Sequence, residues 1–201
     1  MSLIAERTVT QPKEETALDG LTGCHNHESF KKELDRELAE AKRHRHPLSL
    51  AILDLDRFNQ LNTSAGRDAG DIALKELARC FREELRGVDS VARLSGDQFA
   101  LTLPQSFSEG AKLVVERLRL RIALIVVPKF GSLQTSVGLA TFPTHGHSRA
   151  SLVLAAETAL ANAKLAGQNR VFVADHLPAS PDDHFGPFSL KPRSRRGSTR
   201  S

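Results

Sequence analysis

The sequence predicts an α+β fold in which helices cover a central, mostly antiparallel sheet. Segments with the apolar spacing of helices alternate with short apolar runs that are typical of strands. Two of these runs flank residues 95–98, whose Gly-Asp centre is typical of a β-hairpin tip. The 201 residues, of which 40% are hydrophobic, suffice for one domain with a sizeable core.

Composition narrows the class of protein. The net charge is +4, and residues 177–201, with five basic side chains against two acidic ones, hold +3 of it. Residues 1–176 therefore carry a net charge of only +1, which argues against a nucleic-acid-binding core, because such a core needs a basic surface. No stretch approaches the ~18 apolar residues of a membrane span, and residues 1–20 hold no apolar signal segment. We therefore expect a cytoplasmic protein without a transmembrane segment, in which Cys24 and Cys80 are reduced thiols.

The two ends of the chain differ in composition from its middle. Residues 1–17 show no helical periodicity and are predicted to form a mobile arm. Residues 177–201 combine prolines with basic and small side chains, which predicts a disordered basic tail. The folded domain is expected to span residues 18–176.

The domain is expected to begin with a helix and a buried strand. A turn-rich segment, 19–30, places Asn26 or Glu28 near a helix cap, and apolar residues then recur at helical spacing to about His44. The apolar run 48–56 predicts a buried strand that ends in two carboxylates.

These two carboxylates, Asp54 and Asp56, would lie on the same face of a strand. Burying them is costly unless a cation or hydrogen-bond donors meet them, so a Mg²⁺ site is one hypothesis. An ordinary exposed strand end is the other. A hairpin beside this strand would bring Asp97 to the same point and add a carboxylate.

The later elements follow from the same periodicities. A helix is expected over about 68–85, and the hairpin strand after residue 98 should end at Pro104. Residues 106–109 resemble a capping box that opens a helix to about Ile125. A strand over 134–141, a loop with exposed His145 and His147, a helix stopped by Gly167 and a strand over 171–174 complete the order. The inward residues of the 68–85 helix are predicted to be Ile72, Leu74, Leu77, Ala78 and Phe81.

A family resemblance rests on the hairpin. The segment Arg93–Phe99, Arg-Leu-Ser-Gly-Asp-Gln-Phe, resembles the signature of GGDEF domains, the diguanylate cyclase family, with Ser95 in place of Gly and Gln98 in place of Glu. Similarity extends over about residues 19–171. It implies the palm-like nucleotide-cyclase fold, and an activity in which two GTP molecules, held by two protomers with Mg²⁺, are joined into cyclic di-GMP.

The resemblance also implies roles for single residues. Asp54 and Asp97 match metal ligands, Asn62 and Asp71 match guanine contacts, and Lys164 matches a phosphate contact. A carboxylate can accept from guanine N1 and N2, so the chemistry suits these positions. The structural alternatives are a turn Asn, a helix-start Asp and a cation at a helix C-terminus.

A second site follows from Arg86-Gly-Val-Asp89, which stands at the spacing of the family's product-binding inhibitory motif, RxxD. Arginine offers a planar fork for phosphate or for guanine O6 and N7, and Asp89 can accept from guanine. Arg117 matches a further arginine that assists this site, but it could equally belong to a solvated helix face. The resemblance thus implies that Arg86, Asp89 and Arg117 bind cyclic di-GMP.

Substitutions weaken the implied catalysis. At the catalytic turn, Asp97 persists, but Gln98 is neutral and cannot accept a proton, and Ser95 adds a Cβ beside the phosphate site. Asn59 and Gln168 replace two cations of the family. The sequence therefore favours a cyclic di-GMP receptor that signals to a protein partner and is built on a weakly active or inactive diguanylate cyclase domain. A working diguanylate cyclase, a GTP-binding scaffold and a homodimer stay open.

Overall fold

A computed structural model describes residues 17–175 of the chain. The predicted basic tail and nearly all of the predicted N-terminal arm lie outside these residues. Among residues 17–175, no helix is long and apolar enough to cross a membrane.

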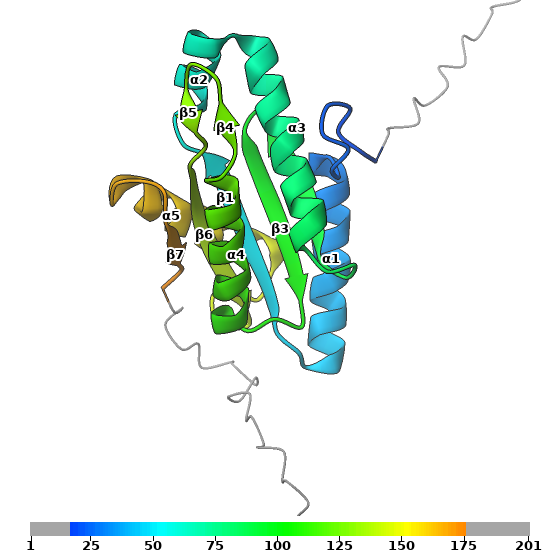
Figure 1. The fold of residues 1–201 in the computed structure, drawn as a ribbon. Helices are drawn as coiled ribbons and strands as arrows, with labels where there is room; N and C mark the ends of the chain where they lie inside the picture. Colours follow the sequence, from blue (N-terminus) through cyan, green and yellow to red (C-terminus); the bar gives the residue numbers. More distant parts are fainter. Residues whose placement is uncertain (1–16, 176–201) are drawn as a thin grey trace, which may run out of the picture.

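A five-stranded sheet in the order β2-β3-β1-β6-β7 forms the centre of the fold (Figure 1). β1 pairs antiparallel with both β3 and β6, β2 pairs antiparallel with β3, and only β7 runs parallel to its neighbour β6. The predicted fold class is therefore confirmed. The strands are β1 (Leu48–Leu55), β2 (Ser90–Ser95), β3 (Gln98–Pro104), β6 (Thr135–Phe142) and β7 (Val171–Val173).

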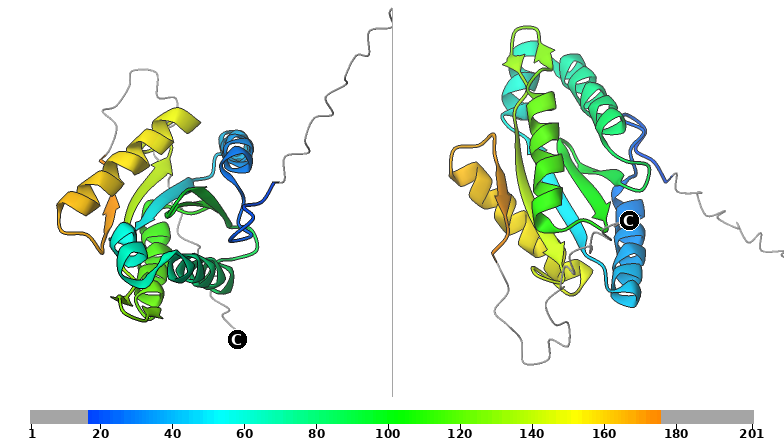
Figure 2. Two further views of the ribbon diagram at one scale, coloured as in Figure 1. Left: turned by 90° about the horizontal axis from the view of Figure 1, so that it is seen from above. Right: turned by 60° about the horizontal axis from the view of Figure 1, so that its bottom comes forward.

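Helices cover both faces of this sheet. Figure 2 shows α3 and α4 on one face, and α1 and α5 on the other. The short α2 packs with α3, and a small two-stranded sheet of β4 and β5, which the sequence did not predict, follows α4. These elements are α1 (His27–His44), α2 (Phe58–Ala65), α3 (Arg67–Glu84), α4 (Ser108–Ile122), α5 (Arg149–Leu165), β4 (Val126–Val127) and β5 (Gly131–Ser132).

Strand β1 connects two hydrophobic cores because its side chains alternate between the faces of the sheet. Ala51, Leu53 and Leu55 pack in the core beneath α3 and α4. Leu50 and Ile52 pack in the other core, beneath α1 and α5. The continuous apolar run of the sequence reflects this burial on both faces.

Most predicted helix boundaries are confirmed, and two details are wrong. Helix α1 begins after Asn26, whose side chain accepts from the Ser29 N–H, and ends at His44 as expected. Ile72, predicted to face inward, is 60% exposed because it lies off the buried stripe of α3. The predicted capping box is absent: Phe107 is the N-cap of α4 and makes no side-chain capping bond.

His145 also differs from its prediction as an exposed loop residue. It is buried, and its Nδ1 accepts a 2.8 Å hydrogen bond from the Thr141 backbone N–H. The His145 backbone N–H in turn donates to the Thr141 carbonyl oxygen, so the loop closes on the end of β6. A partner four residues away explains why this polar ring can be buried.

Candidate functional site

The β2–β3 hairpin places the signature turn at the end of β1. Gly96 takes a positive φ of 40° at the tip, a conformation that glycine adopts without strain. In the β1–β3 register Asp54 stands opposite Gln98, and the Leu55 N–H lies 3.4 Å from the Asp97 carbonyl oxygen. The expected approach of the hairpin to β1 is confirmed.

Three predicted site residues meet here from three different elements. Lys164, in the last turn of α5, lies with its Nζ 2.7 Å from Asp54 Oδ1. Partial burial, and then the charge of Asp54, raise the pKa of Asp97, while Lys164 and Arg93 oppose the shift. Asp54, Asp97 and Lys164 therefore act on one another electrostatically.

This carboxylate pair has the chemistry of a divalent-cation site. Two half-buried carboxylates that repel each other are stabilised by a cation, and Mg²⁺ commonly takes only one or two of them. Within residues 17–175 no group of three or more His, Cys, Asp or Glu side chains could hold a metal ion. A Mg²⁺ ion at Asp54 and Asp97 would therefore draw its other ligands from backbone carbonyl oxygens, phosphate oxygens or water.

Asp56, the other carboxylate of the strand end, has a different environment. It is only 4% exposed; its Oδ1 accepts from Ser136 Oγ at 2.7 Å and its Oδ2 from the Asn169 N–H at 2.9 Å. Hydrogen-bond donors, rather than a cation, thus meet this carboxylate. Asp56 fixes the loop after α5 to the end of β1.

The predicted guanine contacts lie at the corner between α2 and α3. The Asn62 side chain packs against Gly70, where an added Cβ would come within 2.0 Å of Asn62 Oδ1. Asp71 follows Gly70 and is exposed. The corner depends on Gly70 because only a residue without a side chain lets α3 approach Asn62 so closely.

Four residues differ from those usual in the family: two flank the signature turn, and two lie in other elements. Ser95 ends β2 and is exposed, whereas Gln98 begins β3 and is half-buried. Asn59 is exposed on α2, and Gln168 takes a positive φ of 62° in the loop after α5.

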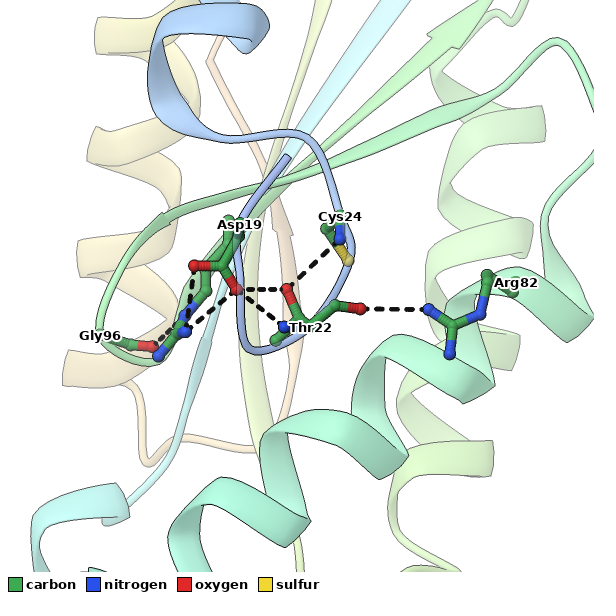
Figure 3. A network of polar contacts seen from close by, with 6 residues as sticks. Asp19, Thr22, Cys24, Arg82 and Gly96 are labelled. Atoms are coloured by element: carbon green, nitrogen blue, oxygen red, sulfur yellow. Dashed lines mark hydrogen bonds and ion pairs between the residues drawn. The ribbon is translucent and has the colours of Figure 1, made fainter. Parts of the chain in front are cut away.

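A polar network that the sequence analysis missed fixes the signature turn (Figure 3). Arg93 donates from Nε to the Gly96 carbonyl oxygen at 2.8 Å and from its guanidinium to Asp19 Oδ1 at 3.1 Å. Thr22 donates to the same carboxylate oxygen through its N–H and its hydroxyl. Burial raises the pKa of Asp19, but the bonds from Thr22 and Arg93 outweigh it and leave that pKa below its usual value. The turn is thus tied to the loop before α1.

The RxxD motif forms a tight turn at the opposite end of β2. The Arg86 N–H donates to Asp89 Oδ2 at 3.0 Å, and the Asp89 N–H donates to the Arg86 carbonyl oxygen at 3.0 Å. This turn borders a groove of about 540 Å³. The groove is lined by His25, Glu33, Arg36, Glu37, Arg86, Gly87, Val88, Asp89, Ser90, Pro104 and Gln105.

Arg117 does not line this groove. It pairs with Glu84 at 2.8 Å through Nε and donates to the Glu84 carbonyl oxygen at 3.0 Å. The second wall comes instead from α1, where Arg36 lies 3.0 Å from Glu37 and 3.9 Å from Glu33. No local pattern predicts this wall, because α1 and the RxxD turn are about fifty residues apart.

The raised pKa of Asp97 predicts a pH-dependent stability difference for Asp97→Asn. Between the unfolded pKa, about 3.9, and the higher folded pKa, the folded state holds more protons, so wild-type stability falls as pH rises through this window. The variant lacks this loss. The free energy of unfolding of the variant should exceed that of the wild type by up to about 1 kcal/mol at pH 7. This difference should vanish below a pH of about 3.5. Urea unfolding at both pH values measures it, and an equal difference at both would contradict the assignment.

Comparisons with known proteins agree with this geometry. Residues 16–170 match the family described as "Diguanylate cyclase, GGDEF domain". The chain is 35% identical over 166 residues to diguanylate cyclase DgcP of Pseudomonas aeruginosa, an alignment that covers 81% of this chain and 24% of DgcP. The chain thus spans about a quarter of that relative.

Solved structures give the same result. The GGDEF domain of DgcB from Caulobacter crescentus, in complex with c-di-GMP, superposes with a TM-score of 0.74 at 27% identity, covering 81% of this chain and 98% of that one. Diguanylate cyclase SiaD from Pseudomonas aeruginosa, in complex with its activator SiaC, superposes with a TM-score of 0.74 at 34% identity, covering 81% and 63%. The chain therefore belongs to the GGDEF-domain family of diguanylate cyclases.

Proposed function

We propose that this GGDEF domain is a receptor for cyclic di-GMP, which binds in the groove beside Arg86 and Asp89. The observation that carries the proposal is the RxxD turn, which is intact and borders a groove large enough for a ligand. The signature turn, by contrast, has a neutral Gln98 where the family has a carboxylate. Ligand recognition is thus supported more strongly than turnover.

The groove supplies the chemistry that a cyclic dinucleotide needs. The exposed Arg86 guanidinium can pair with a phosphate or with guanine O6 and N7, and Asp89 can accept from guanine N–H groups. On the α1 wall, Arg36 supplies a second cation, and the carboxylates of Glu33 and Glu37 can accept from a guanine. Arg36 lines the groove and Arg117 does not, so we assign to Arg36 the assisting role that the family resemblance implies for Arg117.

The residues of the cyclase site support weak turnover at most. Asp54 and Asp97 fit a Mg²⁺ ion, which would supply charge stabilisation at a triphosphate and activation of a hydroxyl. Lys164 can pair with phosphate oxygens once it leaves Asp54. Gln98 cannot hold a proton taken from the attacking hydroxyl, and Asn59 and Gln168 supply no charge to the phosphates.

The test is a calorimetric titration of cyclic di-GMP into nucleotide-free protein. We expect a Kd in the micromolar range or tighter, about −8 kcal/mol or better. Arg86→Ala should weaken binding tenfold or more, since a charge-assisted contact of about 1.5–3 kcal/mol is lost. Arg36→Ala and Arg117→Ala form a matched pair, and only the first should weaken binding. Absence of cyclic di-GMP binding by the wild type would rule out the receptor function. An equal loss of affinity in Arg36→Ala and Arg117→Ala would mean that Arg117 also contributes to the site.

A working diguanylate cyclase is the second candidate, favoured by the convergence of Asp54, Asp97 and Lys164 on one point. It predicts magnesium-dependent conversion of GTP into cyclic di-GMP, and the rate per protein should rise with concentration because two protomers must meet. Absence of product at high protein concentration would reject it. Tight GTP binding without product and without cyclic di-GMP binding would instead indicate a scaffold domain.

A further inference from the structure

The contact between Lys164 and Asp54 has a consequence for metal binding. Lys164 Nζ lies 2.7 Å from Asp54 Oδ1, and the Asp54 side chain is only 17% exposed. The ammonium thus occupies one of the two carboxylates that a divalent metal ion would use.

We propose that the Lys164 ammonium competes with divalent metal ions for Asp54 and keeps the carboxylate pair closed to metal alone. A metal ion bound to Asp54 Oδ1 would lie beside the ammonium, and two cations on one partly buried carboxylate repel each other. Metal binding therefore requires Lys164 to leave, and the ion pair is lost in the exchange.

A phosphate ligand changes this balance. Lys164 belongs to the last turn of α5, and its side chain is 39% exposed, so the ammonium can turn from Asp54 towards an anion in the solvent. A phosphate group that pairs with Lys164 removes the competitor from Asp54. By linkage, metal and phosphate ligand then strengthen each other's binding to the same extent.

The inference depends on metal binding at Asp54 and Asp97, the part of the proposed function that concerns the cyclase site. It does not depend on cyclic di-GMP binding at Arg86. An experiment with metal alone, without any nucleotide, therefore tests it separately from the receptor function.

The test is Mn²⁺ binding to the full chain without nucleotide, measured from the electron paramagnetic resonance signal of the free ion. Lys164→Met removes the charge but keeps most of the side-chain length, and should tighten Mn²⁺ binding about tenfold, within the usual range of coupling between sites. Lys164→Arg keeps the cation and should bind Mn²⁺ as weakly as the wild type. Circular dichroism confirms that each variant is folded.

Two controls identify the site. Lys112→Met removes an exposed lysine from α4, away from Asp54, and should leave Mn²⁺ affinity unchanged. Adding Asp54→Asn to Lys164→Met should abolish the gain. The proposal is overturned if Lys164→Met binds Mn²⁺ no tighter than the wild type, if Lys112→Met produces the same gain, or if the gain survives without the Asp54 carboxylate.

Discussion

Gly138→Ala should destabilise the domain by about 3 kcal/mol or more, because helix α5 crosses the middle of β6 at this residue. A Cβ on Gly138 would lie 2.0 Å from the Ala156 carbonyl oxygen and 2.3 Å from the Leu160 nitrogen. Both are backbone atoms of α5, so no side-chain rotation relieves the clash. The helix must move away from the sheet, and the core beneath α1 and α5 opens with it.

Urea unfolding measures this effect, and the chain offers a control of opposite sign. Gly110 lies on α4, is exposed, and an added Cβ there meets nothing within 4 Å. Gly110→Ala should therefore stabilise the domain by up to about 1 kcal/mol through helix propensity. If the free energy of unfolding of Gly138→Ala lies within about 1 kcal/mol of the wild-type value, then α5 does not approach β6 as closely as described.

Asp56→Ala should lower the free energy of unfolding by about 2–4 kcal/mol, whereas Asp54→Ala should lower it by less than about 1 kcal/mol. Removing the buried Asp56 carboxylate leaves the Ser136 hydroxyl and the Asn169 N–H without their acceptor. Removing Asp54 breaks one ion pair to a partly exposed lysine and relieves the repulsion on Asp97.

Metal binding should show the opposite order: the Asp54 variant should lose more than the Asp56 variant. When Lys164→Met is added to each variant, so that the carboxylate pair is open to metal, Mn²⁺ binding should be lost with Asp54→Ala and retained by the folded fraction with Asp56→Ala, because only Asp54 belongs to the carboxylate pair with Asp97. Denaturant unfolding of the single variants and a Mn²⁺ titration of the double variants provide the two readouts. A larger stability loss in Asp54→Ala, or Mn²⁺ binding lost only in the folded double variant with Asp56→Ala, would contradict the assignment.

Much of the architecture is determined by local sequence patterns. The helical spacing of Phe30, Leu34 and Leu38 and the capping position of Asn26 predicted α1 with its end at His44. The apolar run of β1 and the Gly-Asp centre of the hairpin likewise predicted the sheet that surrounds the site. These predictions succeed because periodicity and capping depend on neighbours within one or two turns of the chain.

Which side chains meet depends on how distant segments of the chain pack together. The strand pattern does not distinguish Asp54 from Asp56, but α5 brings Lys164 to the first while Ser136 and Asn169 bring donors to the second. His145 is buried because its ring finds a backbone donor after the loop closes.

The same holds for the wall opposite the RxxD turn, which comes from α1 and not from the helix that carries Arg117. Local patterns in the sequence are enough to predict the fold class and to recognise the family. The partners of the site residues follow from how the segments pack, because burial and charge pairing depend on contacts between segments far apart in the chain.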